Sequence, residues 1–217
     1  WSVEVTNRTG RRLSVDAVLA QDLGLAGEDV VRRSEAYTSQ YIDHTVVRAG
    51  DLGIVLCSRQ NVLQAGTVPW IMHGCLGGAA GFLTDGVQLY GLAYRATNVP
   101  AALVRSTLPN RVYQYELAIP TIRSRSVSLP VGASGRITFF AAFEADHPAA
   151  TGPSDVVGAL RAAEAFTSLP PLVHPVEPRP RRRPAGVFDA PVMFESRDLV
   201  TDELERWFGP EWRHVEW

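Results

Sequence analysis

The chain has 217 residues, of which 46% are hydrophobic and 20% are charged, and its formal net charge is −2 at pH 7. This length is ample for one substantial hydrophobic core. The weak net charge argues against nucleic acid or a membrane surface as the main partner, and no apolar run reaches the length that crosses a bilayer.

Residues 1–150 are predicted to form an antiparallel β-sandwich. Val3 and Val5 alternate with polar residues before a turn at 7–10, and the alternation resumes at Leu13, which is typical of a hairpin with one buried face. Later turn signals recur at sandwich-like intervals, and no strand–helix alternation indicates a parallel sheet. Strands are expected at 3–5, 13–19, 41–48, 54–58, 70–76, 81–84, 87–94, 112–129 and 136–144, with one or two helical turns at 28–36 and a tight turn at 84–86.

The last third of the chain has a different composition. A short helix is predicted at 151–168, with Ser154 as its N-cap and one apolar stripe. Residues 169–196 are predicted to be a Pro/Arg-rich linker, because prolines exclude a regular helix or a central strand. Residues 197–217 are predicted to be a truncated segment with a helix at 201–208. We interpret both chain ends as cuts through a longer polypeptide; no signal peptide is visible, and the expected location is cytoplasmic.

The residue types that carry chemistry form no complete active site. The five histidines show no metal-ligand spacing, so no metal site and no catalytic residue are assigned. Asp146 and His147 are adjacent, and neighbours on a strand point to opposite faces, so they are not expected to pair unless the strand is broken there. Cys57 and Cys75 are too few for a disulfide framework and are predicted to be buried thiols.

One polar cluster follows the expected strand at 54–58, and a second surrounds the turn at 84–86. Their side chains supply directional hydrogen bonds and aromatic faces, which suit sugar hydroxyls and pyranose C–H surfaces. The alternative is that these groups satisfy loop backbone while the tryptophan fills the core. The substrate-binding candidates are Arg59, Gln60, Asn61, Trp70, His73 and Asp85, with Gln64, Gln88 and Tyr90 beside them.

Several stretches carry a resemblance to a known family. They are WSVEVTNRTGRRLSVD, QDLGLA, SEAYTSQYIDHT, CSRQN, GFLTDGVQLYG, NRVYQYELA and FFAAFEADHPAAT, spread in order over the first two thirds of the chain. The chain resembles the N-terminal β-sandwich region of glycoside hydrolase family 94 phosphorylases, in particular those that act on β-1,2-glucans.

The resemblance implies a galactose-mutarotase-like supersandwich and a part in inverting phosphorolysis. In that family an aspartic acid on an (α/α)6 barrel protonates the glycosidic oxygen while inorganic phosphate, the co-substrate, attacks the anomeric carbon. The barrel would lie beyond residue 217, so this fragment alone is expected to be inactive. The implied partners are β-1,2-glucan oligosaccharides and the chain's own barrel, and the resemblance also allows a second copy in a homodimer. No metal or organic cofactor is expected.

Three other interpretations remain open. The chain could be the corresponding region of a cyclic β-1,2-glucan synthase. It could instead be a non-catalytic carbohydrate-binding module, which would bind glucan by itself. It could also be a scaffold or dimerisation sandwich, which would expose a large apolar face once its neighbour is removed.

Overall fold

The computed structural model describes residues 1–114, 117–168 and 200–209. The chain divides into two compact units, Trp1–Pro171 and Leu172–Trp217, which are described separately. In the second unit the described element is α7 (Thr201–Phe208), which ends at Gly209 with a φ of 57° and confirms the helix expected at 201–208. The linker predicted at 169–196 lies outside the described residues and stays a prediction.

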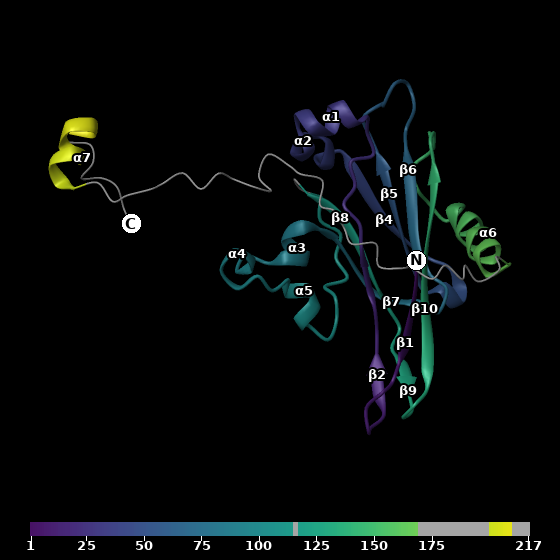
Figure 1. Cartoon of the computed structure of the whole chain (residues 1–217). Helices are drawn as coiled ribbons and strands as arrows, with labels where there is room; N and C mark the ends of the chain where they lie inside the picture. Colours follow the sequence, from purple (N-terminus) through teal and green to yellow (C-terminus); the bar gives the residue numbers. More distant parts are fainter. Residues whose placement is uncertain (115–116, 169–199, 210–217) are drawn as a thin grey trace. The chain divides into compact units, whose positions relative to one another are not determined.

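The larger layer of the first unit is an antiparallel sheet. Within the described residues it has five strands in the order β1-β10-β6-β5-β4 (Figure 1). Each strand pairs with its neighbour in antiparallel register. The strands are β1 (Ser2–Thr6), β10 (Ser134–Glu144), β6 (Trp70–Cys75), β5 (Ile54–Gln60) and β4 (Ile42–Arg48).

The smaller layer consists of two antiparallel groups of strands. One group has the order β3-β8-β7 and the other pairs β2 with β9. These strands are β3 (Val18–Ala20), β8 (Ala118–Ser124), β7 (Ala79–Asp85), β2 (Leu13–Val15) and β9 (Val127–Leu129). Leu56 and Phe139 of the larger sheet pack against Phe82 and Ile122 of the smaller group, which makes the space between the layers the hydrophobic core.

Short helices cover the outer faces of both layers. On the larger sheet, α6 (Asp155–Ser168) places Ala159 and Ala163 over Met72 and Phe140 (Figure 1). On the smaller group, α3 (Gly86–Tyr90) and α5 (Ala101–Val104) pack over β7 and β8. The remaining helical segments are α1 (Glu28–Arg33), α2 (Glu35–Gln40), α4 (Tyr94–Thr97) and the 3-10 turn η1 (Gly50–Leu52).

The mainly β, antiparallel sandwich expected from the sequence is confirmed, but three expected strands are wrong in detail. Residues 87–94 form α3 and the start of α4, because Asp85 caps a helix by accepting a hydrogen bond from the backbone N–H of Val87 at 2.7 Å. The strand at 112–129 is replaced by β8 and β9. The strand at 13–19 divides into β2 and β3, which pair with β9 and β8.

Candidate functional site

The candidate site begins with the β5–β6 hairpin, whose loop ends in a tight turn. Gln64 and Thr67 exchange two backbone hydrogen bonds of 2.8 and 3.0 Å. Between them, Ala65 and Gly66 have φ values of 50° and 90°. Positive φ at both central residues is the pattern of a type I′ turn, whose twist matches that of the paired strands.

Arg59 lies at the end of β5 directly opposite Trp70 of β6. Its Nε donates to the carbonyl oxygen of His147 at 3.0 Å, and its Nη2 donates to that of Pro148 at 2.9 Å. Its Nη1 donates to Oδ1 of Asn61 at 2.5 Å. The guanidinium therefore joins the β5–β6 loop to the connection between β10 and α6.

Trp70 is 1% exposed and belongs to the core cluster beneath α6. Its ring stacks on the imidazole of His147, with centroids 4.7 Å apart and planes 10° apart. Its Nε1 donates to Oγ1 of Thr151 at 2.9 Å. The indole thus packs on one side against the core and on the other against the β10–α6 connection.

No hydrogen-bond partner was assigned to His147 from the sequence, but the structure gives its side chain one. Its Nε2 lies 3.0 Å from Oδ1 of Asp155, and the two side chains are only 11% and 14% exposed. Adjacent Asp146 does not pair with it and instead accepts the backbone N–H of Val68 at 3.0 Å. The sequence signal was present, because Asp155 is an acidic residue in the first turn of the expected helix.

Gln60 and His73 lie on the opposite face of the sheet, between the two layers. Gln60 donates to the carbonyl oxygen of Thr38 at 3.2 Å and accepts the N–H of Val62 at 3.1 Å. Nε2 of His73 lies 2.9 Å from Oε1 of Gln21, and burial lowers the pKa of His73 to about 4. Both side chains therefore form buried hydrogen bonds within the chain, whereas Nδ1 of His73 is buried without a hydrogen-bond partner in the described structure.

His44 is a second buried histidine in this interior layer. Its Nδ1 lies 2.9 Å from Oγ of Ser58 on the neighbouring strand. Burial first, and then the charge of a protonated His73, lower the pKa of His44 to about 4. Two neutral imidazoles thus share the space between the sheets.

The structure does not bring the six candidate residues into one site. Arg59, Asn61 and Trp70 gather near the β10–α6 connection, whereas Gln60 and His73 face the interior, because successive strand residues alternate between faces. Asp85 lies on the other layer, where it caps α3. Gln60, Trp70, His73 and Asp85 are at most 1% exposed.

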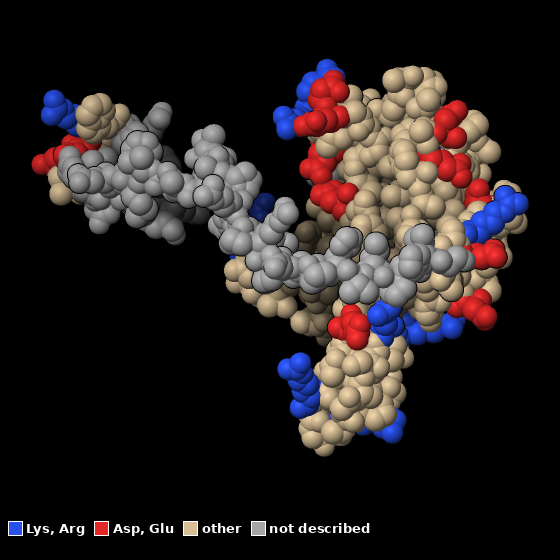
Figure 2. Space-filling view, turned by 45° about the vertical axis from the view of Figure 1, so that its right-hand side comes forward, with Lys and Arg blue, Asp and Glu red and all other residues tan. Residues whose placement is uncertain are grey.

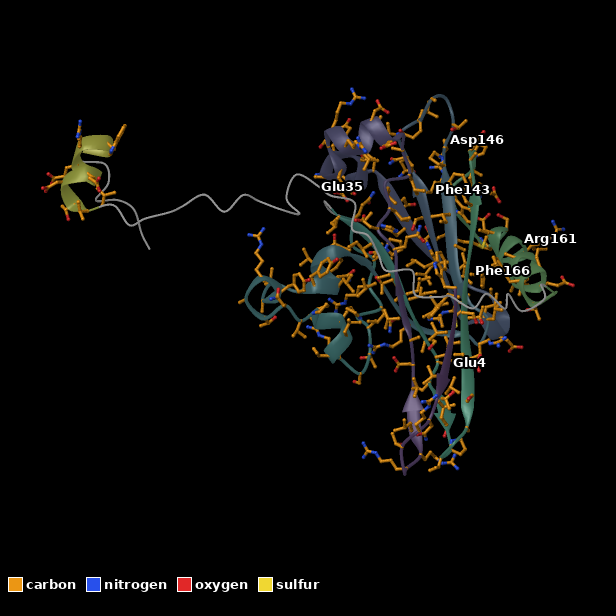
Figure 3. All side chains as sticks on the ribbon, viewed as in Figure 1. Glu4, Glu35, Phe143, Asp146, Arg161 and Phe166 are labelled. Atoms are coloured by element: carbon orange, nitrogen blue, oxygen red, sulfur yellow. The ribbon has the colours of Figure 1, made fainter. Side chains whose placement is uncertain are left out.

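A hollow lies beside the tip of the β5–β6 hairpin, where Gln64 is one of its lining residues. It has a volume of about 470 Å³ and contains Phe143, whose side chain is 60% exposed at the end of β10 (Figure 3). We call it the hairpin groove. Its lining residues are Leu25, Ala26, Gly27, Asp29, Val30, Gln64, Ala65, Thr67, Pro69, Phe143 and Ala145.

A second hollow of about 680 Å³ lies against α3 and α4. It is lined by Asp85, Val87, Leu92 and Leu117 and by two tyrosines, Tyr90 and Tyr94, whose ring centroids are 4.7 Å apart. On the face that Figure 2 shows, acidic and basic side chains are interspersed.

The described residues offer limited means for cofactor chemistry. They contain no group of three or more His, Cys, Asp or Glu side chains placed to hold a metal ion. Cys57 and Cys75 are both buried free thiols, and burial, with a smaller effect of Asp155, raises the pKa of Cys57 to about 12.

None of the helices described is long and apolar enough to cross a membrane.

Comparison with known proteins identifies the family. The family described as the SOGP N-terminal domain matches residues 1–141, a range that takes in the described strands of both layers except the last three residues of β10. The chain is also 43% identical over 118 residues to a 1,2-beta-oligoglucan phosphorylase of Listeria innocua serovar 6a. The aligned part is 54% of this chain but 11% of that relative. The chain belongs to the SOGP N-terminal domain family.

Proposed function

We propose that this chain is the N-terminal β-sandwich of an inverting β-1,2-glucan phosphorylase. The observation that supports it is the 43% identity to a 1,2-beta-oligoglucan phosphorylase, within a family match to residues 1–141. The catalytic acid would be an aspartic acid on an (α/α)6 barrel outside this chain. A cytoplasmic location is part of the same proposal.

The proposed reaction needs one carboxyl group and inorganic phosphate. The carboxylic acid gives its proton to the glycosidic oxygen, the bond from the anomeric carbon to that oxygen breaks, and a phosphate oxygen forms the new bond from the opposite face. Inversion of a β-glucoside gives α-glucose 1-phosphate and a glucan shorter by one unit. Phosphate replaces the water of an inverting hydrolase, so no metal or organic cofactor is proposed.

The sandwich would contribute to glucan binding through the hairpin groove. Phe143 offers an exposed aromatic face and Gln64 a directional amide in a concave surface, the combination that sugar rings and hydroxyls use. Among the candidates from the sequence, exposed Asn61 and half-buried Arg59 would be closest to such a ligand. Gln60, Trp70, His73 and Asp85 would act by holding the surrounding backbone.

Two measurements on the whole polypeptide that carries this chain test the proposal. The first is phosphate-dependent release of glucose 1-phosphate from β-1,2-glucan; no release would refute phosphorylase activity. The second compares Phe143→Ala with Leu63→Ala, because Leu63 is 63% exposed on the β5–β6 hairpin beside the groove but does not line it. Phe143→Ala is expected to raise the glucan KM about 5-fold, for a stacking contact of about 1 kcal/mol, with kcat unchanged. Equal KM values for both variants and the parent would exclude the groove as a glucan surface.

A scaffold role is a second candidate, supported by exposed apolar side chains on α3–α5. Leu92 is 94% exposed, and Val87, Leu103 and Val104 are 55%, 54% and 70% exposed. Apolar surface of this kind marks contact with another protein surface, here proposed to be the barrel or a second copy. Sedimentation of the whole polypeptide with Leu92→Ser and Val104→Ser tests the homodimer: dissociation supports it, and an unchanged mass leaves the barrel as the partner.

A further inference from the structure

His147 is held by hydrogen-bond acceptors at both ring nitrogens. Its Nδ1 lies 2.8 Å from the carbonyl oxygen of Ala149, and its Nε2 lies 3.0 Å from the carboxylate of Asp155. A carbonyl oxygen and an ionised carboxylate can only accept. A neutral imidazole has one N–H, so it would turn a lone pair toward one of these oxygens, whereas the imidazolium donates to both. The geometry therefore selects the charged ring.

The same ring is the centre of a network that holds the β10–α6 connection. Trp70 stacks on its face, and Arg59 binds its carbonyl oxygen. The other oxygen of Asp155 accepts the backbone N–H of Gly152 at 2.8 Å, and Thr151 binds the indole N–H of Trp70. Each of these contacts fixes part of residues 147–155 against the end of the larger sheet.

The helix that follows is attached to the sheet by few apolar side chains. Its fully buried residues are alanines, Ala159 and Ala163, while Val156 is partly buried and the ring of Phe166, 38% exposed, lies with its centroid 6.0 Å from that of Phe140. Small and partly exposed side chains remove limited apolar area from water, so hydrophobic burial is only part of what holds α6. Asp155, the first residue of α6, therefore supplies a substantial part of its attachment.

We propose that protonated His147 is a charge-dependent clamp that fixes the β10–α6 connection and α6 to the larger sheet, and that loss of its proton loosens this attachment. The neutral ring keeps its stacking on Trp70 but loses one of its two hydrogen bonds and the ion pair with Asp155. The helix α6 would then be held mainly by the apolar contacts of Val156, Ala159, Ala163 and Phe166.

The charged groups around the ring favour the imidazolium. Burial lowers the pKa of His147, but the hydrogen bonds to Asp155 and Ala149, together with the negative charges of Asp155 and Glu144, outweigh burial and raise it above its usual value. Arg59, from β5, contacts the main chain of His147, and Asp146 is bound to Val68. Cys57, beneath Asp155, is a buried thiol that stays protonated over this range.

The direction of the pH effect follows from the raised pKa. The unfolded histidine has a pKa near 6.5, so the stabilisation is complete below about pH 6.5 and is lost as the pH rises through the higher pKa of the folded chain. As the pH rises through the folded pKa of His147, the hydrogen-exchange protection of α6 amides should fall. The fall should be up to about tenfold for each unit by which the pKa of His147 in the folded chain exceeds its pKa in the unfolded chain. Amides of β5 in the same sample provide the reference.

The test combines spectroscopy and exchange on the 217-residue chain. Nitrogen-15 spectra at about pH 6.5 should show both ring nitrogens of His147 protonated; a single protonated nitrogen would overturn the proposal. Asp155→Asn should lower the pKa of His147 and abolish the pH dependence of α6 protection. Asp146→Asn, the matched control in the same connection, should leave both unchanged. His147→Gln should give pH-independent protection at the weaker level.

Two results would contradict the clamp directly. One is α6 protection that stays constant between about pH 6 and about pH 9 in the unmodified chain. The other is the same pH dependence in Asp155→Asn as in Asp146→Asn. Because the nitrogen-15 measurement uses the unmodified chain, it decides the matter even if His147→Gln does not fold.

Discussion

The two buried histidines between the sheets should make the folded chain sensitive to acid. His73 is 1% exposed and His44 is 5% exposed. Burial lowers the pKa of His73 to about 4, and burial with the charge of His73 does the same for His44. Both rings are therefore neutral in the folded chain at neutral pH.

The size of the effect follows from the difference between folded and unfolded pKa values. Between about pH 6.5 and about pH 4 the unfolded chain binds protons that the folded chain does not, so stability is complete above about pH 6.5 and falls as the pH falls. A difference of about 2.5 units at about 1.4 kcal/mol per unit gives about 3.5 kcal/mol for each histidine. Loss of twice that amount is comparable to a total stability of roughly 5–15 kcal/mol.

The assay is urea unfolding of the 217-residue chain, followed by tryptophan fluorescence, at about pH 7 and about pH 4.5. The double variant His44→Asn/His73→Gln removes both titrations, and each amide nitrogen matches the ring nitrogen that binds Ser58 or Gln21. The variant should lose several kcal/mol less stability on acidification than the parent chain. His147→Gln is the control, since the stabilisation that it removes is present throughout the acid range, so the variant keeps the acid loss. Equal losses in the double variant and the parent would refute the reasoning.

Two further predictions concern backbone geometry at single positions. Ala65→Asn should stabilise the chain by up to about 1 kcal/mol, because Ala65 has a φ of 50° in an exposed type I′ turn, where Asn before Gly is preferred. Thermal unfolding measures this gain in stability. The control is Ala150→Asn, at an exposed position without positive φ, which should stay within about 0.5 kcal/mol of the parent. Gly74→Ala should destabilise by about 1–3 kcal/mol, because its Cβ would overlap the ring of Phe140, its cross-strand partner. Gly10→Ala, whose Cβ meets nothing within 4 Å, is the control for urea unfolding. A stability gain at Ala150 equal to that at Ala65, or a loss at Gly10 equal to that at Gly74, would contradict these explanations.

Local pattern was sufficient for most of the sandwich. Apolar patterns bounded by turn signals predict β4, β5, β6 and β10 within a few residues of their observed bounds. The strands β5 and β6 are apolar on both faces because one face lies between the layers and the other lies under α6. It failed at residues 87–94, where the apolar residues of GVQLY suit a strand or a short helix equally. There the cap provided by Asp85 and the packing of Leu89 against Ala102 stabilise the helix.

For the candidate site, too, the sequence predicted some contacts and not others. The sequence placed Arg59, Asn61 and Trp70 near one another, since the two strands of a hairpin meet, and strand periodicity separates Arg59 from Gln60 by face. It could not pair Trp70 with His147, because that contact joins segments far apart along the chain. It could not pair His147 with Asp155, eight residues later, because that contact depends on how the connection between β10 and α6 folds back. The sequence by itself thus determined the sandwich and its hairpins, whereas tertiary packing decided that the polar cluster after β5 anchors the connection to α6. Local periodicity specifies which face a side chain occupies, but only the assembled layers specify what lies opposite it.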